Sequence, residues 1–206
     1  FIFFCVAILI IFSRSFFLHK IIHFSLEKIT EKKVKIENIN INFKEQKLII
    51  NDLKILNNQN FNYKNILFCN EIIIHFNFFD LFKETIFFDE IIFKNPIIYI
   101  EIKNSKDNIS VLEKRNNYKP KVYPKKINDR NIIFKKLKIL EPKANLSVDE
   151  FNKYENLELS NMTFTNVGNT TNKSLHFKKI FKIILSNIYL RVPDFDMRKK
   201  LKDIYK

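Results

Sequence analysis

Side chains that could carry acid–base or metal chemistry are dispersed along this sequence. Two of the four histidines, His19 and His23, lie four residues apart in a segment of helical pattern, a spacing that could hold a metal ion. Without an acidic or cysteine partner to complete such a site, we predict no metal ligand. Asp89 and Glu90 are adjacent, and in a strand they would point to opposite faces. They therefore do not form a catalytic pair.

Motifs for nucleotide or nucleophile chemistry are also missing from the sequence. It has no GxSxG, Walker or dinucleotide fingerprint, and one glycine in 206 residues nearly excludes a phosphate-cradling loop. Cys5 lies in an apolar run and Cys69 in an expected strand, so we expect two separate buried thiols rather than a disulfide. Capping and the helix dipole explain Asp194 and Asp196. We predict no catalytic residue, no cofactor and no enzyme.

The charge balance is a clue to the partner. The chain has 36 Lys and Arg against 22 Asp and Glu, a formal net charge of +14, which favours nucleic acid or an anionic surface. Phe, Ile, Asn and Lys are abundant, and their codons are A/T-rich, so genome composition explains part of the lysine excess. The basic stretches 119–126 and 178–182 are typical of a solvated face. We expect no nucleic acid, and the alternative is a soluble basic domain that contacts nucleic acid or anionic surfaces.

The first 18 residues predict a transmembrane signal anchor. Residues 1–12 read FIFFCVAILIIF, which is shorter than the roughly 20 apolar residues that span a bilayer. The chain begins with Phe, so we expect upstream residues to complete the span. A cleaved signal peptide and a buried helix of a soluble protein are the other interpretations. Long domains translocate largely regardless of flanking charge, and we expect the rest of the chain to be exported.

Beyond the anchor, the period of apolar residues changes. Residues 19–33 keep helical spacing and predict a helical connector. In residues 34–113 apolar residues alternate with Lys and Asn, which predicts a first β module. The expected strands of this module cover residues 34–43, with a bulge at 37–38, then 48–56, with a bulge at 51–52, and 66–78, 85–94 and 97–103.

The remaining chain divides into a linker and a second module. Residues 114–130 carry two prolines and many charges without an apolar period, which indicates a loop or linker. Residues 131–206 predict a second, partial β module that ends in a helix from Asp194, its N-cap, with Phe195, Leu201 and Ile204 on one side. The strands expected in this module cover residues 132–140, 144–148, 157–165 and 175–190.

Isoleucine and phenylalanine gather on one face of the expected sheet. This candidate apolar groove face consists of Ile72, Ile74, Phe76, Phe78, Phe87, Ile91, Phe93, Ile98 and Ile100. Such a face must be covered by a helix, by a second sheet or by lipid. The pattern alone does not decide between an ordinary β core and a lipid-lined groove.

The order of these features resembles a known family. A strand of the form Leu-x-Ile-x-Asp-Leu-x-Ile covers residues 48–55 and follows the anchor and short helix. Residues 79–86 form a corner, residues 91–101 read IIFKNPIIYIE, and residues 107–112 read DNISVL. Over roughly residues 1–113, the sequence resembles the N-terminal module of AsmA-like proteins of Gram-negative bacteria.

The resemblance implies a fold, a location and a function. The implied fold is mainly β: an N-terminal membrane helix, then a long, curved antiparallel sheet that forms a β-groove, and a short C-terminal helix. The implied location is the bacterial inner membrane, with a single pass and the domain in the periplasm. Larger relatives are bridge-like lipid-transfer proteins, so the implied partners are phospholipid acyl chains and anionic headgroups. The implied function is non-catalytic lipid handling or outer-envelope assembly.

Overall fold

The computed structural model describes residues 22–23, 26–27, 32–77, 79–80, 83–104, 106–109, 131–168 and 177–205. The anchor expected at residues 1–18, most of the connector expected at 19–33 and the linker expected at 114–130 lie outside these residues. Within the described part, no helix is both long and apolar enough to cross a membrane.

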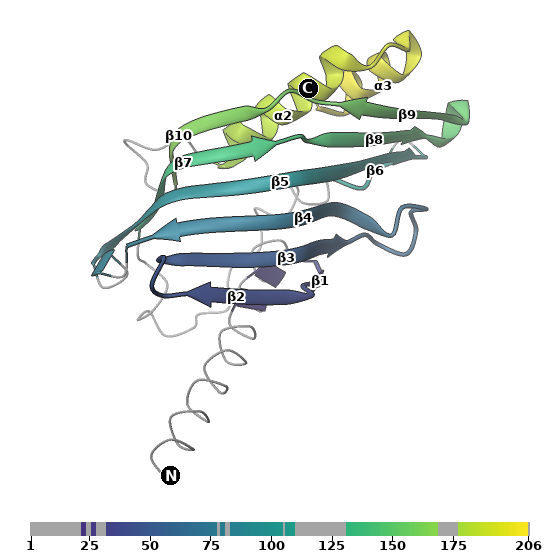
Figure 1. Ribbon diagram of the computed structural model, residues 1–206. Coiled ribbons are helices and arrows are strands. Elements are labelled where there is room, and N and C mark those ends of the chain that lie inside the picture. Colours follow the sequence, from purple (N-terminus) through teal and green to yellow (C-terminus); the bar gives the residue numbers. More distant parts are fainter. Residues whose placement is uncertain are drawn as a thin grey trace, which may run out of the picture.

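One mixed sheet dominates the described residues (Figure 1). Its ten strands are β1 (Val34–Lys35), β2 (Asn38–Asn42), β3 (Lys47–Leu56), β4 (Asn65–Phe76), β5 (Thr85–Lys103), β6 (Lys106–Asp107), β7 (Asn131–Leu140), β8 (Lys143–Val148), β9 (Lys153–Glu158) and β10 (Met162–Gly168). The described helices are the 3-10 turn η3 (Asp149–Phe151), α2 (Phe177–Arg191) and α3 (Phe195–Tyr205). The mainly β prediction and the short C-terminal helix are confirmed.

The prediction of an all-antiparallel sheet is wrong. Strands β3, β4 and β5 form an antiparallel meander, but β7 and β8 both pair with β5 in parallel. Strand β5 is 19 residues long, so β7 lies along its first half and β8 along its second. The 27 residues between β5 and β7 (104–130) are long enough for the crossover that parallel pairing needs.

Strand β5 also joins two stretches that the sequence separates. Residues 85–94 and 97–103 were expected as two strands because Asn95 and Pro96 interrupt them. Instead, Asn95 adopts a left-handed φ of 50°, which asparagine tolerates, and Pro96 keeps its place in the ladder opposite Cys69. The chain therefore passes through this point without a turn.

The second half differs most from expectation. Residues 175–190 were predicted as a strand, yet residues 177–191 form helix α2. Ile180, Ile184 and Ile188 recur every four residues, and this helical period outweighs the strand preference of the β-branched side chains. The strand expected at 157–165 is divided between β9 and β10, because residues 159–161 form a corner. At that corner, Asn161 Oδ1 accepts a 2.7 Å hydrogen bond from the backbone of Glu141.

A row of left-handed residues crosses the sheet. Asp52, Asn95 and Glu141 have φ values of 49°, 50° and 51° and lie at corresponding positions on β3, on β5 and between β7 and β8. The register is unbroken at Asp52, so the bulge expected at 51–52 is a change of backbone conformation and not an inserted residue. Alternation reverses there, since Ile50 and Leu53, three residues apart, are buried in the same cluster.

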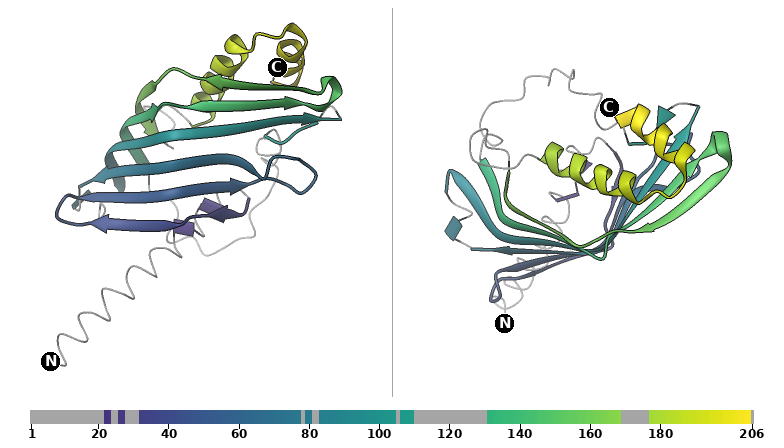
Figure 2. Two further views of the ribbon diagram at one scale, coloured as in Figure 1. Left: turned by 45° about the vertical axis from the view of Figure 1, so that its right-hand side comes forward. Right: turned by 90° about the horizontal axis from the view of Figure 1, so that it is seen from above.

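The sheet curves around the two helices. Seen from above, α2 and α3 lie inside its concave side (Figure 2). Two clusters of buried apolar residues fill this concavity, and both include Ile55 and Ile184 as packed neighbours. Side chains of β3, β4, β5, β7 and β8 that point inward meet α2, which makes the concave side the core of the domain.

Helix α3 begins at the expected N-cap, but the residues expected on one side of it do not all lie on that side. Asp194 Oδ1 accepts a 2.9 Å hydrogen bond from the backbone N–H of Met197, which confirms Asp194 as the N-cap. Leu201 is buried, whereas Phe195 is 74% exposed, so these two side chains do not share a side of the helix. The Ile204 side chain lies outside the described part.

Candidate functional site

Most of the predicted groove face does lie on one side of the sheet. Ile72 is paired with Phe93, and Ile74 with Ile91, and all four belong to one inner cluster or pack against it. Phe76, at the end of β4, is 7% exposed. Across the left-handed row, Ile98 and Ile100 contribute to the second inner cluster.

The structure does not place two members of the predicted face, Phe78 and Phe87, on the inner side of the sheet. Phe78 lies outside the described residues. The register places Phe88, and not Phe87, opposite Phe76, because the pairing shifts between His75 and Phe76. The Phe88 ring stacks on that of Phe134, 5.0 Å away and packed against an inner cluster, so Phe87 projects from the other face. A one-residue shift of this kind leaves no signal in the sequence.

The concave face does not form an open groove where α2 covers it. Ile180, Leu185 and Ile188 of α2 are buried against the sheet. Ile22 and Leu26 also pack against the inner cluster. The sequence left open whether a helix, a second sheet or lipid covers this face, and in the described residues helices cover part of it.

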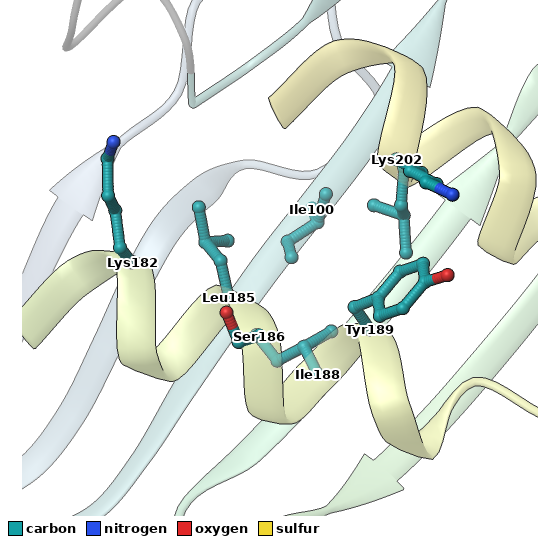
Figure 3. A pocket seen from close by; sticks show the side chains of 8 residues that line it. Ile100, Lys182, Leu185, Ser186, Ile188, Tyr189 and Lys202 are labelled. Atoms are coloured by element: carbon teal, nitrogen blue, oxygen red, sulfur yellow. The ribbon is translucent and has the colours of Figure 1, made fainter. Parts of the chain in front are cut away.

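An apolar hollow remains where α2, α3 and β5 meet (Figure 3). We call this space of about 250 Å³ the apolar hollow. Its walls are mainly apolar, and four hydrophilic or amphipathic side chains complete them. The lining residues are Ile100, Leu185, Ile188 and Leu201, with Lys182, Ser186, Tyr189 and Lys202.

Two lysines give the apolar hollow a positive rim. The Lys182 and Lys202 side chains stand on different sides of the apolar residues in Figure 3. Both lysines are exposed, and neither forms a salt bridge with any residue that the structure describes. Lys200, by contrast, pairs with Glu150 at 2.8 Å. The rim of the hollow is therefore suited to an anion and its floor to a hydrocarbon.

The corner between α2 and α3 fixes the shape of this hollow. Lys153 Nζ lies 2.5 Å from Asp194 Oδ2, and this hydrogen bond is the main cause that raises the pKa of Lys153 and lowers the pKa of Asp194. The Arg198 guanidinium donates hydrogen bonds of 2.6 and 3.0 Å to the carbonyl oxygen of Val192. Val192 and Met197 are fully buried. The two helices are thus held at a fixed angle before any ligand arrives.

The groups considered for chemistry are separated in the structure. Asp89 pairs with Lys135 at 2.6 Å and Glu90 with Lys138 at 2.8 Å, in two independent bridges. His23 Nδ1 lies 3.7 Å from Glu27, an acidic neighbour that the sequence analysis missed, while His19 is outside the described residues. Among the residues described, no three potential ligands form a metal-binding group.

The Cys69 thiol is inert in this fold. Its side chain is completely buried, as expected, and burial raises its pKa to about 12. Cys5 lies outside the described residues. A thiol with so high a pKa is protonated at neutral pH and provides neither a nucleophile nor a metal ligand.

Comparisons of the chain with family models, with curated proteins and with solved structures find no match. The AsmA-like resemblance therefore stays a prediction from the sequence, as do the anchor and the periplasmic location.

Proposed function

We propose that this protein is a non-catalytic, membrane-anchored component of the bacterial envelope that handles lipid. In this proposal residues 1–18 hold it at the inner membrane, the sheet lies in the periplasm, and an acyl chain of an anionic lipid enters the apolar hollow. The observation that carries the proposal is the combination of an apolar floor and an unpaired cationic rim in one hollow.

The chemistry of the apolar hollow matches an amphiphile. Buried Ile100, Ile188 and Leu201 offer hydrocarbon contacts, which favour an acyl chain by about 0.8 kcal/mol per buried CH₂ group. Lys182 and Lys202 offer charge to a carboxylate or phosphate headgroup. A neutral apolar ligand would leave these lysines without a role.

The size of the hollow limits the proposal. Its volume of about 250 Å³ lies just below the roughly 300–1,000 Å³ of pockets that enclose a small molecule. It therefore accommodates part of one chain and not a whole diacyl lipid. Because α2 covers the neighbouring sheet, the proposal does not require a continuous groove.

The test fills the hollow with a side chain. Ser186 lines the hollow and is exposed, so Ser186→Phe places a ring in it without disturbing the core. Leu190→Phe is the matched control, since Leu190 is on the same helix, 73% exposed and not part of the lining. Full-length protein extracted in mild detergent is analysed by native mass spectrometry for bound lipid. We expect lipid adducts on wild type and Leu190→Phe, and their loss on Ser186→Phe.

A second pair of variants tests the rim. Lys182→Gln should lower the occupancy of anionic lipid, whereas Lys179→Gln, one turn away and not in the lining, should leave it unchanged. The proposal fails if wild type carries no lipid, or if both lysine variants behave alike. Salt-sensitive binding of a single-stranded oligonucleotide by wild type, without bound lipid, would favour the alternative of a basic nucleic-acid-binding domain.

A further inference from the structure

A second hollow lies where β1 and β3 meet the loop that joins β3 to β4. This polar hollow, as we call it, has a volume of about 540 Å³. The residue types in its walls differ from those of the apolar hollow, because lysine and amide residues outnumber apolar residues among those that line it. The side chains that matter here are Lys35, Lys54, Lys64, Asn57, Phe61 and Tyr63.

Like charges face each other in the wall of the polar hollow. Lys35 of β1 and Lys54 of β3 are direct cross-strand partners. Directly opposed like charges destabilise a sheet unless something neutralises them. Neither these two lysines nor Lys64 forms a salt bridge within the described part of the chain.

The acidic groups near this pair do not form salt bridges with it in the described part of the chain. Glu37 lies close enough to feel the positive charge of Lys54, and its carboxyl group shares a hydrogen bond with Asp52, which is the main cause that raises the pKa of Glu37. The ammonium group of Lys54 lies 5.6 Å from the centre of the Phe68 ring. In the described part of the chain, no carboxylate is therefore bound directly to these cations, and the space in front of them is open to an anion.

An unsatisfied amide donor is part of the same wall. The side-chain nitrogen of Asn57 is buried and has no hydrogen-bond partner in the described structure. The side-chain oxygen of Asn57 accepts a hydrogen bond from the backbone of Asn58 at 2.9 Å, so the orientation of the amide is defined. Buried donors are almost always paired in folded proteins, and a small rotation of the Asn57 side chain would bring this one to an acceptor on a ligand in the hollow.

The loop that forms the polar hollow is held from behind. Glu101 is completely buried, and its carboxylate accepts hydrogen bonds of 2.7–2.9 Å from the backbone N–H groups of Asn62 and Tyr63. The Tyr63 ring packs against that of Tyr99 at 5.2 Å. A loop fixed in this way needs little reordering when a ligand binds, which favours affinity.

We infer that the polar hollow is a binding site for a phosphate group. Phosphate supplies two negative charges and several acceptor oxygens, enough for the two facing lysines and for the Asn57 amide. The walls formed by Phe61 and Tyr63 leave room for the molecule that carries the phosphate. That molecule is either a lipid headgroup or a soluble phosphate ester, and this inference stands whether or not the apolar hollow binds lipid.

The experiment compares two double variants of the full-length protein with equal changes in charge. Lys35→Gln with Lys54→Gln removes the facing pair, and Lys44→Gln with Lys47→Gln removes two lysines near the β2–β3 turn, away from the hollow. Calorimetry measures binding of inorganic phosphate and of glycerol 3-phosphate. We expect the first variant to bind about a hundredfold more weakly, since each of the two bonds to a charged group contributes about a factor of ten, and the second variant to bind like wild type.

Vesicles identify the source of the phosphate. If wild type binds phosphatidylglycerol vesicles and the variant without Lys35 and Lys54 does not, the site is assigned to a lipid headgroup. Binding of glycerol 3-phosphate without such vesicle binding assigns it to a soluble ester. The inference is overturned if wild type binds neither, or if the two double variants lose affinity equally. Folding is checked by thermal melting, where loss of the repelling pair should not lower the melting temperature.

Discussion

The two hollows lie on opposite faces of one sheet and are built differently. On β3, Leu53 and Ile55 point toward α2, and Lys54 between them points to the other face and the polar hollow. The apolar hollow is a space left where two helices meet a strand. The polar hollow is enclosed by a loop that a buried carboxylate holds. The comparison teaches that an alternating strand can contribute to two hollows lined by different residue types, and that each hollow depends on a different support.

Removing the buried carboxylate should have the largest effect. Glu101→Leu leaves the N–H groups of Asn62 and Tyr63 without an acceptor, so we expect a loss of about 4 kcal/mol in the free energy of unfolding. Urea denaturation measures it. Glu101→Gln, which keeps one acceptor oxygen, should lose less. Phosphate binding should disappear from Glu101→Leu while lipid occupancy stays, and a loss of both would show that the hollows are not independent.

Shortening a side chain in the floor of the apolar hollow should destabilise the protein without affecting the polar hollow. Leu201 is 3% exposed, and Leu201→Ala should lower the free energy of unfolding by about 3 kcal/mol through lost contacts and a larger cavity. The exposed Leu190→Ala, as a control, should change it by less than about 0.5 kcal/mol. Calorimetric phosphate binding should be the same in both variants. Weaker phosphate binding in Leu201→Ala alone would contradict the separation of the two sites.

The stability that the Lys153–Asp194 pair gives to the corner between α2 and α3 should depend on pH. Hydrogen bonding to Lys153 lowers the pKa of Asp194 below its ordinary 3.8, so its contribution to stability is complete above that value and lost as pH falls through the lowered pKa. The raised pKa of Lys153 gives a contribution that is complete below 10.5 and lost as pH rises further. Asp194→Asn keeps the cap but not the charge, so its melting temperature should fall less on acidification. Equal acid sensitivity in both proteins would exclude this role for Asp194.

Removing the repulsion between Lys35 and Lys54 should have the smallest effect on stability, and it should stabilise the protein rather than destabilise it. Lys54→Gln removes one of two opposed positive charges, so we expect the protein without ligand to gain a few tenths of a kcal/mol in the free energy of unfolding. The gain should shrink at high salt, where repulsion is screened. Lys44→Gln, with no cross-strand lysine, is the reference. A destabilised Lys54→Gln would mean that Lys54 serves the fold and not a ligand.

The sequence predicted the strands better than their pairing. Alternation of apolar residues located β3, β4 and β7 closely, because one face of each is buried. It could not predict the parallel pairing of β5 with β7 and β8, which depends on contacts between residues distant in the chain. Residues 175–190 were assigned to a strand, although their isoleucines at 180, 184 and 188 recur with the period of a helix.

The candidate sites show the same limit. Ile100 was predicted on the apolar face, and it does line the apolar hollow. Lys182, Tyr189 and Lys202 were missed because only the packing of α2 and α3 brings them together. The Lys35–Lys54 pair depends on strand register, and the sequence placed the two lysines in separate strands without specifying how these strands align.

The left-handed row at Asp52, Asn95 and Glu141 has a consequence for any attempt to redesign this sheet. Each strand exchanges its inward and outward positions at that line, so the two halves of a strand follow opposite binary patterns. A transplanted strand with uninterrupted alternation would direct lysines into the core on one side of the line. Grafting must therefore treat the line as a seam and supply a residue that tolerates positive φ at the positions of Asp52, Asn95 and Glu141.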